Sequence, residues 1–174
     1  MAHSPHSEQT PQSRQRLLEH GVTIVATGAQ ERRGRAYLLG EDERVLTQGE
    51  LEKRIANGEW QAADCHSVVM IQCVGPWDED ESVPFYCSRV CCNVAVKNAL
   101  KIKELNPACQ VYVLFKEMRT YGFNEAFYTE ARRRGVIFIR YDDTHKPEVS
   151  AGGNGLRVVV HEPALQMPLT LTPD

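Results

Sequence analysis

SVVMIQCVGPWDEDESVPFYCSRVCCNVAVKNALKIKELNPACQVYVLFK (67–116) is the stretch that decides the fold of this chain. Its first seven residues, 67–73, are almost all apolar, which is typical of a strand buried on both faces of a parallel sheet. Residues 88–105 place apolar side chains at helical spacing, and Asn106-Pro107 ends that helix. Residues 110–116 form a second apolar run. The stretch therefore predicts strand, helix and strand, joined through a long loop at 74–86.

The same alternation continues toward the C-terminus. Residues 122–134 have helical spacing and stop at Gly135, and VIFIRY (136–141) predicts a third strand. LRVVVHE (156–162) and LTLTPD (169–174) then predict a β-hairpin, preceded by the glycine-rich loop 150–155. Alternating strands and helices favour a parallel sheet covered by helices. We expect an α/β fold, a three-layer Rossmann-like domain with a small parallel sheet and a C-terminal β-hairpin.

The N-terminal part is less regular. Residues 1–20 are polar at the start and lack periodicity, so we expect a disordered or weakly ordered arm. GVTIVATG (21–28) predicts a short strand that ends in a glycine turn, and TQGELEKRIANG (47–58) predicts a helix with Thr47 as N-cap and Gly58 as stop. The expected organisation is an arm, 1–20, followed by one domain, 21–174.

Composition excludes several classes of protein. The chain has 174 residues and a net charge of −3, which excludes a strongly basic nucleic-acid binder. No apolar run approaches the roughly 20 residues that span a bilayer, and the N-terminus lacks the apolar core of a signal peptide. We therefore expect a soluble, cytoplasmic protein. In a reducing compartment its six cysteines are metal ligands or reactive thiols rather than a disulfide framework.

Four of those cysteines form a candidate site: Cys73, Cys87, Cys91 and Cys92. Cys73 ends the first apolar strand, and the other three lie where the loop enters the helix. Ligands of open α/β sheets bind beyond the carboxyl ends of the strands, so these thiols occupy a cofactor position. With Ser88 as N-cap, Cys91 and Cys92 fall in the first helical turn, where free N–H groups and the helix dipole favour thiolates.

An iron–sulfur cluster is the interpretation that this spacing favours. Adjacent helical residues point about 100° apart, which suits separate irons of one cluster better than a single tetrahedral zinc. Zinc, redox-active cysteines and inert buried cysteines remain alternatives. The turn after the strand lacks the G-x-G-x-x-G fingerprint, so a nicotinamide nucleotide bound in the usual way is not expected. Cys65 and Cys109 fall outside the constellation, and we expect them to be small buried core residues.

Two segments together carry a family resemblance: 68–104, with its YCSRVCC string, and VYVLFKEMRTYGFNEAFYTEARRRGVIFIR (111–140). They resemble the A-type subunit of heterodisulfide reductase, a flavin-containing iron–sulfur protein. The similarity covers roughly residues 21–174. It implies that Cys73, Cys87, Cys91 and Cys92 bind a 4Fe–4S cluster, which relays single electrons to or from FAD within a thioredoxin-reductase-like module.

The resemblance also implies flavin contacts and partners. GVTIVATG resembles the strand and ATG turn with which such flavoproteins approach FAD, so Ala26, Thr27 and Gly28 are candidate FAD-binding residues. The glycine-rich FAD motif and the ferredoxin repeats of the family are absent from this sequence. We therefore expect an excised domain or a short relative that binds FAD only together with a partner. Its partners would be other subunits or domains of a redox complex, and the chain would not turn over alone.

Overall fold

The computed structural model describes residues 17, 19–28, 33–75, 87–153 and 155–174. The chain divides into two units, residues 1–31 and residues 32–174, and the second contains every regular element that is described. Its helices are α1 (Gln48–Ala56), α2 (Cys91–Leu105) and α3 (Glu125–Arg133), with short 3-10 turns at Ala36–Leu38, Ala62–Asp64 and Gly122–Asn124. Its strands are β1 (Ser67–Ile71), β2 (Gln110–Phe115), β3 (Ile137–Arg140), β4 (Glu148–Gly152), β5 (Gly155–Glu162) and β6 (Met167–Leu171).

The first three strands form the predicted parallel sheet, in the order β1-β2-β3. Ser67 pairs with Gln110 at the start of β1, and Tyr112 pairs with Ile137 at the start of β3. Each crossover between these strands contains a helix, α2 after β1 and α3 after β2. The expected α/β architecture is therefore confirmed, and all three strands end at the same edge of the sheet.

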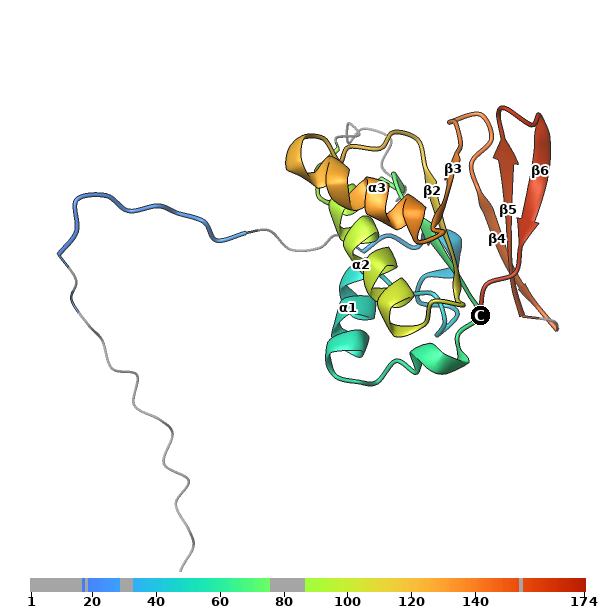
Figure 1. The fold of residues 1–174 in the computed structure, drawn as a ribbon, viewed down its shortest axis with the longest axis horizontal. Coiled ribbons are helices and arrows are strands. Elements are labelled where there is room, and N and C mark those ends of the chain that lie inside the picture. The colour runs from blue at the N-terminus through green and yellow to red at the C-terminus, as the bar shows by residue number, and fades with distance from the viewer. Residues whose placement is uncertain (1–16, 18, 29–32, 76–86, 154) are drawn as a thin grey trace, which may run out of the picture. The chain divides into compact units, whose positions relative to one another are not determined.

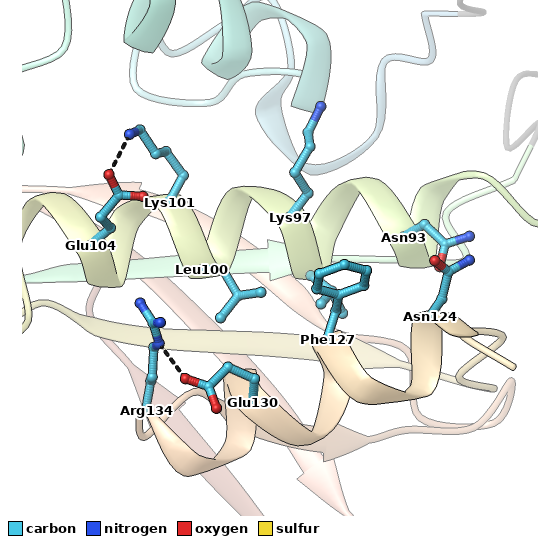
Figure 2. A pocket seen from close by; sticks show the side chains of 10 residues that line it. Asn93, Lys97, Leu100, Lys101, Glu104, Asn124, Phe127, Glu130 and Arg134 are labelled. Carbon is cyan, nitrogen blue, oxygen red and sulfur yellow. Dashed lines mark hydrogen bonds and ion pairs between the residues drawn. The ribbon is translucent and has the colours of Figure 1, made fainter. Parts of the chain in front are cut away.

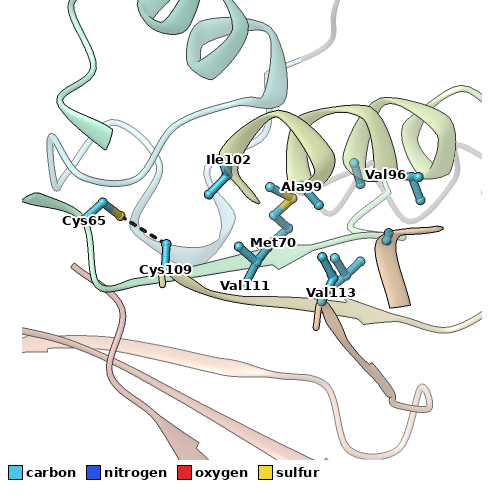
Figure 3. Packing of buried hydrophobic residues seen from close by; sticks show 11 residues of the cluster. Cys65, Met70, Val96, Ala99, Ile102, Cys109, Val111 and Val113 are labelled. Atoms are coloured by element: carbon cyan, nitrogen blue, oxygen red, sulfur yellow. Dashed lines mark hydrogen bonds between the residues drawn. The ribbon is translucent and has the colours of Figure 1, made fainter. Parts of the chain in front are cut away.

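One face of this sheet packs against helices. Val111 and Val113 of β2 share a core cluster with Ala95, Ala99 and Ile102 of α2, as Figure 3 shows in part. Because side chains alternate along a strand, the neighbouring positions of β2 face the opposite side of the sheet. Those positions are apolar too, which is the pattern expected of a strand that is buried on both faces.

The second face is covered by an antiparallel sheet, in the order β4-β5-β6. Leu114, Ile139 and Tyr141 of the parallel sheet form a core with Val158 and Val160 of β5. Helices, parallel sheet and antiparallel sheet make up the three layers visible in Figure 1. The predicted hairpin is present as β5 and β6, but β4 forms where the sequence indicated the loop 150–155. Its sequence, EVSAG, combines small and flexible residues and gives little strand signal.

The helix boundaries follow local chemistry. The Thr47 hydroxyl accepts a hydrogen bond from the Glu50 N–H, and the Glu50 carboxylate accepts one from the Thr47 N–H, so α1 begins with a capping box. Gly58, with φ +70°, follows its C-terminus as predicted. No described helix is long and apolar enough to cross a lipid bilayer.

Two local predictions need correction. Ser88 is not the N-cap of α2. Arg89 takes a left-handed conformation with φ +62°, so the helix begins only at Cys91 and its N-cap is Val90. The Val90 side chain makes no capping hydrogen bond. The strand predicted at 21–28 does not form. Its described residues pair with no other described segment, and its apolar side chains Val22, Ile24 and Val25 are about 80% exposed. Most of the predicted arm, 1–16 and 18, and most of the predicted loop, 76–86, lie outside the described residues.

Candidate functional site

The cysteine site begins where β1 ends. Gln72 continues the parallel pairing by one hydrogen bond, from its N–H to the Leu114 carbonyl at 2.8 Å. Cys73 then takes a left-handed backbone conformation with φ +59°, and Gly75 has φ +67°. A left-handed residue other than glycine costs about 1–2 kcal/mol, so the surrounding structure must hold Cys73 in place. The strain lies at the first candidate ligand.

Tyr141 is one of the groups that hold this turn. It follows β3, is 1% exposed, and its hydroxyl donates to the Gln72 carbonyl at 2.5 Å. Gln72 itself is 3% exposed, so the bond is shielded from water. Burial raises the pKa of the Tyr141 hydroxyl, and negative charge on Tyr37, Cys73, Asp143 and Cys91 adds to that rise. Tyr141 therefore lies beside the cysteine site as a neutral donor.

Cys91 and Cys92 occupy the first turn of α2, as predicted. The Cys92 thiol, and more weakly the backbone N–H groups of Cys92, Cys91 and Cys73, stabilise negative charge on the Cys91 sulfur. These donors outweigh the effect of burial and lower the pKa of Cys91 to about 6. A thiolate at Cys91 is thus stabilised at neutral pH by the N-terminus of the helix and by the turn after β1.

Cys92 has the opposite protonation preference. Because its thiol donates to the Cys91 sulfur and is buried, the pKa of Cys92 is raised. The Cys92 sulfur also lies 3.6 Å from the Glu117 carbonyl, beyond the end of β2, and the residue is 1% exposed. It belongs to neither hydrophobic core cluster of the described residues. Cys92 is therefore a buried thiol with the Cys91 sulfur and the Glu117 carbonyl as its polar neighbours.

Cys87 completes the set from the loop before α2. Its sulfur accepts a hydrogen bond from the Arg89 N–H at 3.4 Å, in the turn made by the left-handed Arg89. The Arg119 guanidinium donates to the Glu117 carboxylate at 2.5 Å. This hydrogen bond and the negative charge of Cys87 raise the pKa of Arg119. This arginine, from the loop after β2, offsets negative charge on the thiolates.

The structure thus brings Cys73, Cys91 and Cys92 into mutual interaction and places Cys87 within electrostatic range of Arg119, at the carboxyl edge of the parallel sheet. All four thiols are free. Within the described ranges, however, no group of three or more His, Cys, Asp or Glu side chains has the arrangement that holds a metal ion. The donor chemistry fits an iron–sulfur cluster, since it combines four thiols with N–H donors to sulfur.

Three residues of this edge were not predicted from the sequence: Arg119, Thr120 and Tyr141. Thr120 is 1% exposed, and its hydroxyl oxygen has no hydrogen-bond partner among the described residues. The sequence does contain a signal for Tyr141. It is the last residue of the predicted strand VIFIRY, and the carboxyl ends of parallel strands lie at the same edge of the sheet as the cysteines. Arg119 and Thr120 lie in a loop whose sequence gives no such signal.

Two hollows accompany the site. A pocket of about 390 Å³ at the same edge is lined by Lys116, Glu117, Arg140, Tyr141, Asp142, Asp143 and Pro163. A larger groove of about 620 Å³ runs between α2 and α3, where Leu100 and Phe127 face each other (Figure 2). Lys101–Glu104 and Arg134–Glu130 ion pairs border this groove. Neither lining contains any of the four cysteines, but the smaller pocket includes Tyr141, which bonds Gln72, and Glu117, whose carbonyl lies 3.6 Å from the Cys92 sulfur.

The candidate flavin residues Ala26, Thr27 and Gly28 belong to the first unit. All three are exposed, and Gly28 has φ +70°, the positive value expected at a glycine turn. Their assignment as FAD-binding residues stays a prediction.

Comparison with known proteins gives a consistent result. No family model matches the chain. It is 36% identical over 137 residues to the A-type iron-sulfur subunit of CoB–CoM heterodisulfide reductase from Methanocaldococcus jannaschii, covering 71% of this chain and 21% of that protein. It is 33% identical over 172 residues to the A-type subunit of the ferredoxin/F420H2-dependent CoB–CoM heterodisulfide reductase from Methanosarcina acetivorans, covering 91% of this chain and 21% of that one.

The fold and the site define an α/β domain with a cysteine-rich sheet edge, and the relatives that it matches are named as subunits of reductases. Over 71–91% of its length the chain is similar to part of the A-type subunits of heterodisulfide reductase, at 32–36% identity. It spans about one fifth of the length of the curated relatives that it matches.

Proposed function

We propose that this chain transfers electrons through a 4Fe–4S cluster bound by Cys73, Cys87, Cys91 and Cys92. The observation that carries the proposal is the network around Cys91, in which one sulfur meets the Cys92 thiol and three backbone N–H groups. Such N–H groups stabilise thiolate and sulfide charge and so raise the reduction potential of a bound cluster. The words "iron-sulfur" in the name of one relative support the same cofactor.

The cluster would supply one-electron transfer, while the residues of this chain hold and tune it. Arg119 would compensate charge beside Cys87, and the turn fixed by Tyr141 would present Cys73. The four sulfurs do not form a metal-binding group among the described residues, so under this proposal cluster binding would draw them together. A change of that kind couples metal binding to local folding.

We further propose that the electrons pass to or from FAD held partly by Ala26, Thr27 and Gly28 and partly by another domain or protein chain. Relatives are named as subunits of heterodisulfide reductases, and this chain corresponds to about a fifth of each. Within this proposal the chain is the cluster domain of an oxidoreductase complex. Flavin binding and turnover belong to the assembled complex.

The decisive experiment measures iron and acid-labile sulfide in the chain purified anaerobically and reconstituted with iron and sulfide. Cys91→Ala and Cys92→Ala should abolish cluster retention and the electron paramagnetic resonance signal of the reduced cluster. Cys109→Ala is the matched control, because Cys109 is a buried cysteine outside the site. Circular dichroism of each variant checks that it is folded.

Three outcomes would contradict the proposal. Equal cluster loss in all three variants would mean that the ligands are wrongly assigned. Zinc without sulfide would favour a zinc-stabilised interaction domain. Free, readily titrated thiols at Cys91 and Cys92 after reconstitution would favour a thiol–disulfide redox protein.

A further inference from the structure

A second pair of cysteines lies away from the site, at the amino ends of the parallel strands. Cys65 precedes β1 and Cys109 precedes β2, and their sulfur atoms are 3.8 Å apart, so the two side chains share one hydrogen bond (Figure 3). They are 44 residues apart in the sequence. Both are free thiols in the helix-side core, where Cys109 is fully buried and Cys65 is 9% exposed. Their burial confirms the prediction, but their contact was not predicted.

The backbones that carry the two thiols are fixed against each other. The Asn106 side chain donates to the carbonyls of Ala62 at 2.8 Å and Cys65 at 2.9 Å. The Lys103 ammonium donates to the Cys109 carbonyl at 2.7 Å, and the Gln110 N–H bonds the His66 carbonyl at 2.8 Å. Ser67 pairs with Gln110, so Cys109 comes one residue out of register with Cys65 on the neighbouring backbone, and the two sulfurs at 3.8 Å must approach to about 2 Å to form a disulfide.

The surroundings also favour ionisation of one thiol. The Cys65 thiol interacts with the Cys109 sulfur and the Lys103 charge is close, and these effects lower the pKa of Cys109 despite its burial. Cys65 is correspondingly the protonated partner, since its pKa is raised by the same contact. A thiolate beside a protonated thiol is the arrangement in which one sulfur is oxidised and the other resolves it, provided that the oxidant can enter. Here it would have to enter past Cys65, which is 9% exposed, because Cys109 is fully buried.

We propose that Cys65 and Cys109 are a redox-active dithiol that closes to a reversible disulfide under peroxide. The Cys109 thiolate attacks one peroxide oxygen, breaking the O–O bond and becoming a sulfenic acid while hydroxide leaves and takes a proton. The Cys65 sulfur then attacks the Cys109 sulfur, and the S–OH oxygen leaves as water. In total, two thiols and one hydrogen peroxide give one disulfide and two waters. Reduction by a dithiol reverses the change.

Closing this pair would join β1 to β2 at the end opposite the cluster site. A cross-link between residues 44 apart restricts the unfolded chain strongly. For a chain of this length, the loop-entropy relation corresponds to a rise in melting temperature of about 10 °C. The oxidised chain should therefore be measurably more resistant to heat.

The test treats the full chain, without added iron, with hydrogen peroxide, then blocks remaining thiols under denaturing conditions. Tandem mass spectrometry of the digest should find a peptide pair linked through Cys65 and Cys109, which dithiothreitol separates. The melting temperature should rise in the wild type. The same treatment should leave the melting temperature unchanged in two variants that keep the four site cysteines, Cys65→Ala and Cys109→Ala.

Cys65→Ala is the more conservative of the two variants, because Cys65 is at the edge of the core, and its reduced form controls for folding. Recovery of Cys65 and Cys109 as separately blocked peptides after peroxide treatment would overturn the proposal. Linkage of either one to a cysteine of the candidate cluster site would overturn it as well. Neither result depends on whether the chain binds a cluster.

Discussion

Replacing Tyr141 by Phe tests whether the turn before Cys73 is held by one buried hydrogen bond. The ring stays, so apolar burial is unchanged, and only the hydroxyl that donates to the Gln72 carbonyl at 2.5 Å is lost. Because Gln72 is 3% exposed, water cannot readily replace the donor. A buried acceptor left without its partner costs about 1–3 kcal/mol. We expect the lower half of that range, since a carbonyl has a second lone pair.

The assay is urea unfolding followed by circular dichroism. A loss of about 1–2 kcal/mol should lower the unfolding midpoint by roughly 0.5–1 M urea without changing the slope. Tyr112→Phe is the matched control, because the Tyr112 hydroxyl bonds the Gln110 side chain at 2.8 Å in an exposed setting. That control should change the free energy of unfolding by less than about 0.5 kcal/mol.

The pH dependence provides a second readout. Burial raises the pKa of Tyr141 in the folded chain above the ordinary value of 10.0, so the folded state keeps a proton that the unfolded state has lost. This contribution to stability is complete below pH 10 and is lost as pH rises toward the folded pKa. The difference in the free energy of unfolding between the wild type and Tyr141→Phe should therefore become smaller above pH 10. Equal stability of the Tyr141→Phe and Tyr112→Phe variants at pH 7 would refute the anchoring role.

Two further predictions concern local structure. Thr47→Ala removes the hydroxyl that accepts from the Glu50 N–H at 3.2 Å, and thermal unfolding should show a loss of about 1 kcal/mol, which Thr47→Ser should largely restore. Gly135→Ala places a side chain at φ +82° with no neighbour within 4 Å of the added carbon, so backbone strain alone should cost about 1 kcal/mol. Gly152→Ala also meets nothing within 4 Å but lacks the positive φ. If Gly135→Ala were as stable as Gly152→Ala, the strain argument would fail.

Much of the fold follows from local patterns that tertiary packing reinforces. The apolar runs of β1, β2 and β3 are buried on two faces, so their sequence signal was strong. Helix α2 ends at Leu105 because Asn106-Pro107 cannot continue it. β4 escaped prediction because a strand of small residues is defined by its partner β5. The strand predicted at 21–28 shows the reverse, since β-branched residues alone do not make a strand without pairing.

The candidate site was predictable only in part. The position of Cys73, Cys91 and Cys92 at one sheet edge follows from the order of strand, loop and helix. The left-handed conformations of Cys73 and Arg89 could not be read from the sequence, because such values are unusual for these residue types. Arg119 follows β2 and Tyr141 follows β3. Their closeness to the cysteines depends on the sheet order β1-β2-β3, which the sequence does not state.

The parallel sheet carries sulfur at both of its ends. Cys65 and Cys109 precede the strands, whereas Cys73 follows β1 and Cys91 and Cys92 face the same exit. The five residues of β1 give a strand about 16 Å long, and this length separates the two sets of thiols. A disulfide between the two sets would have to bridge that distance, so in the folded chain each set can form disulfides only within itself.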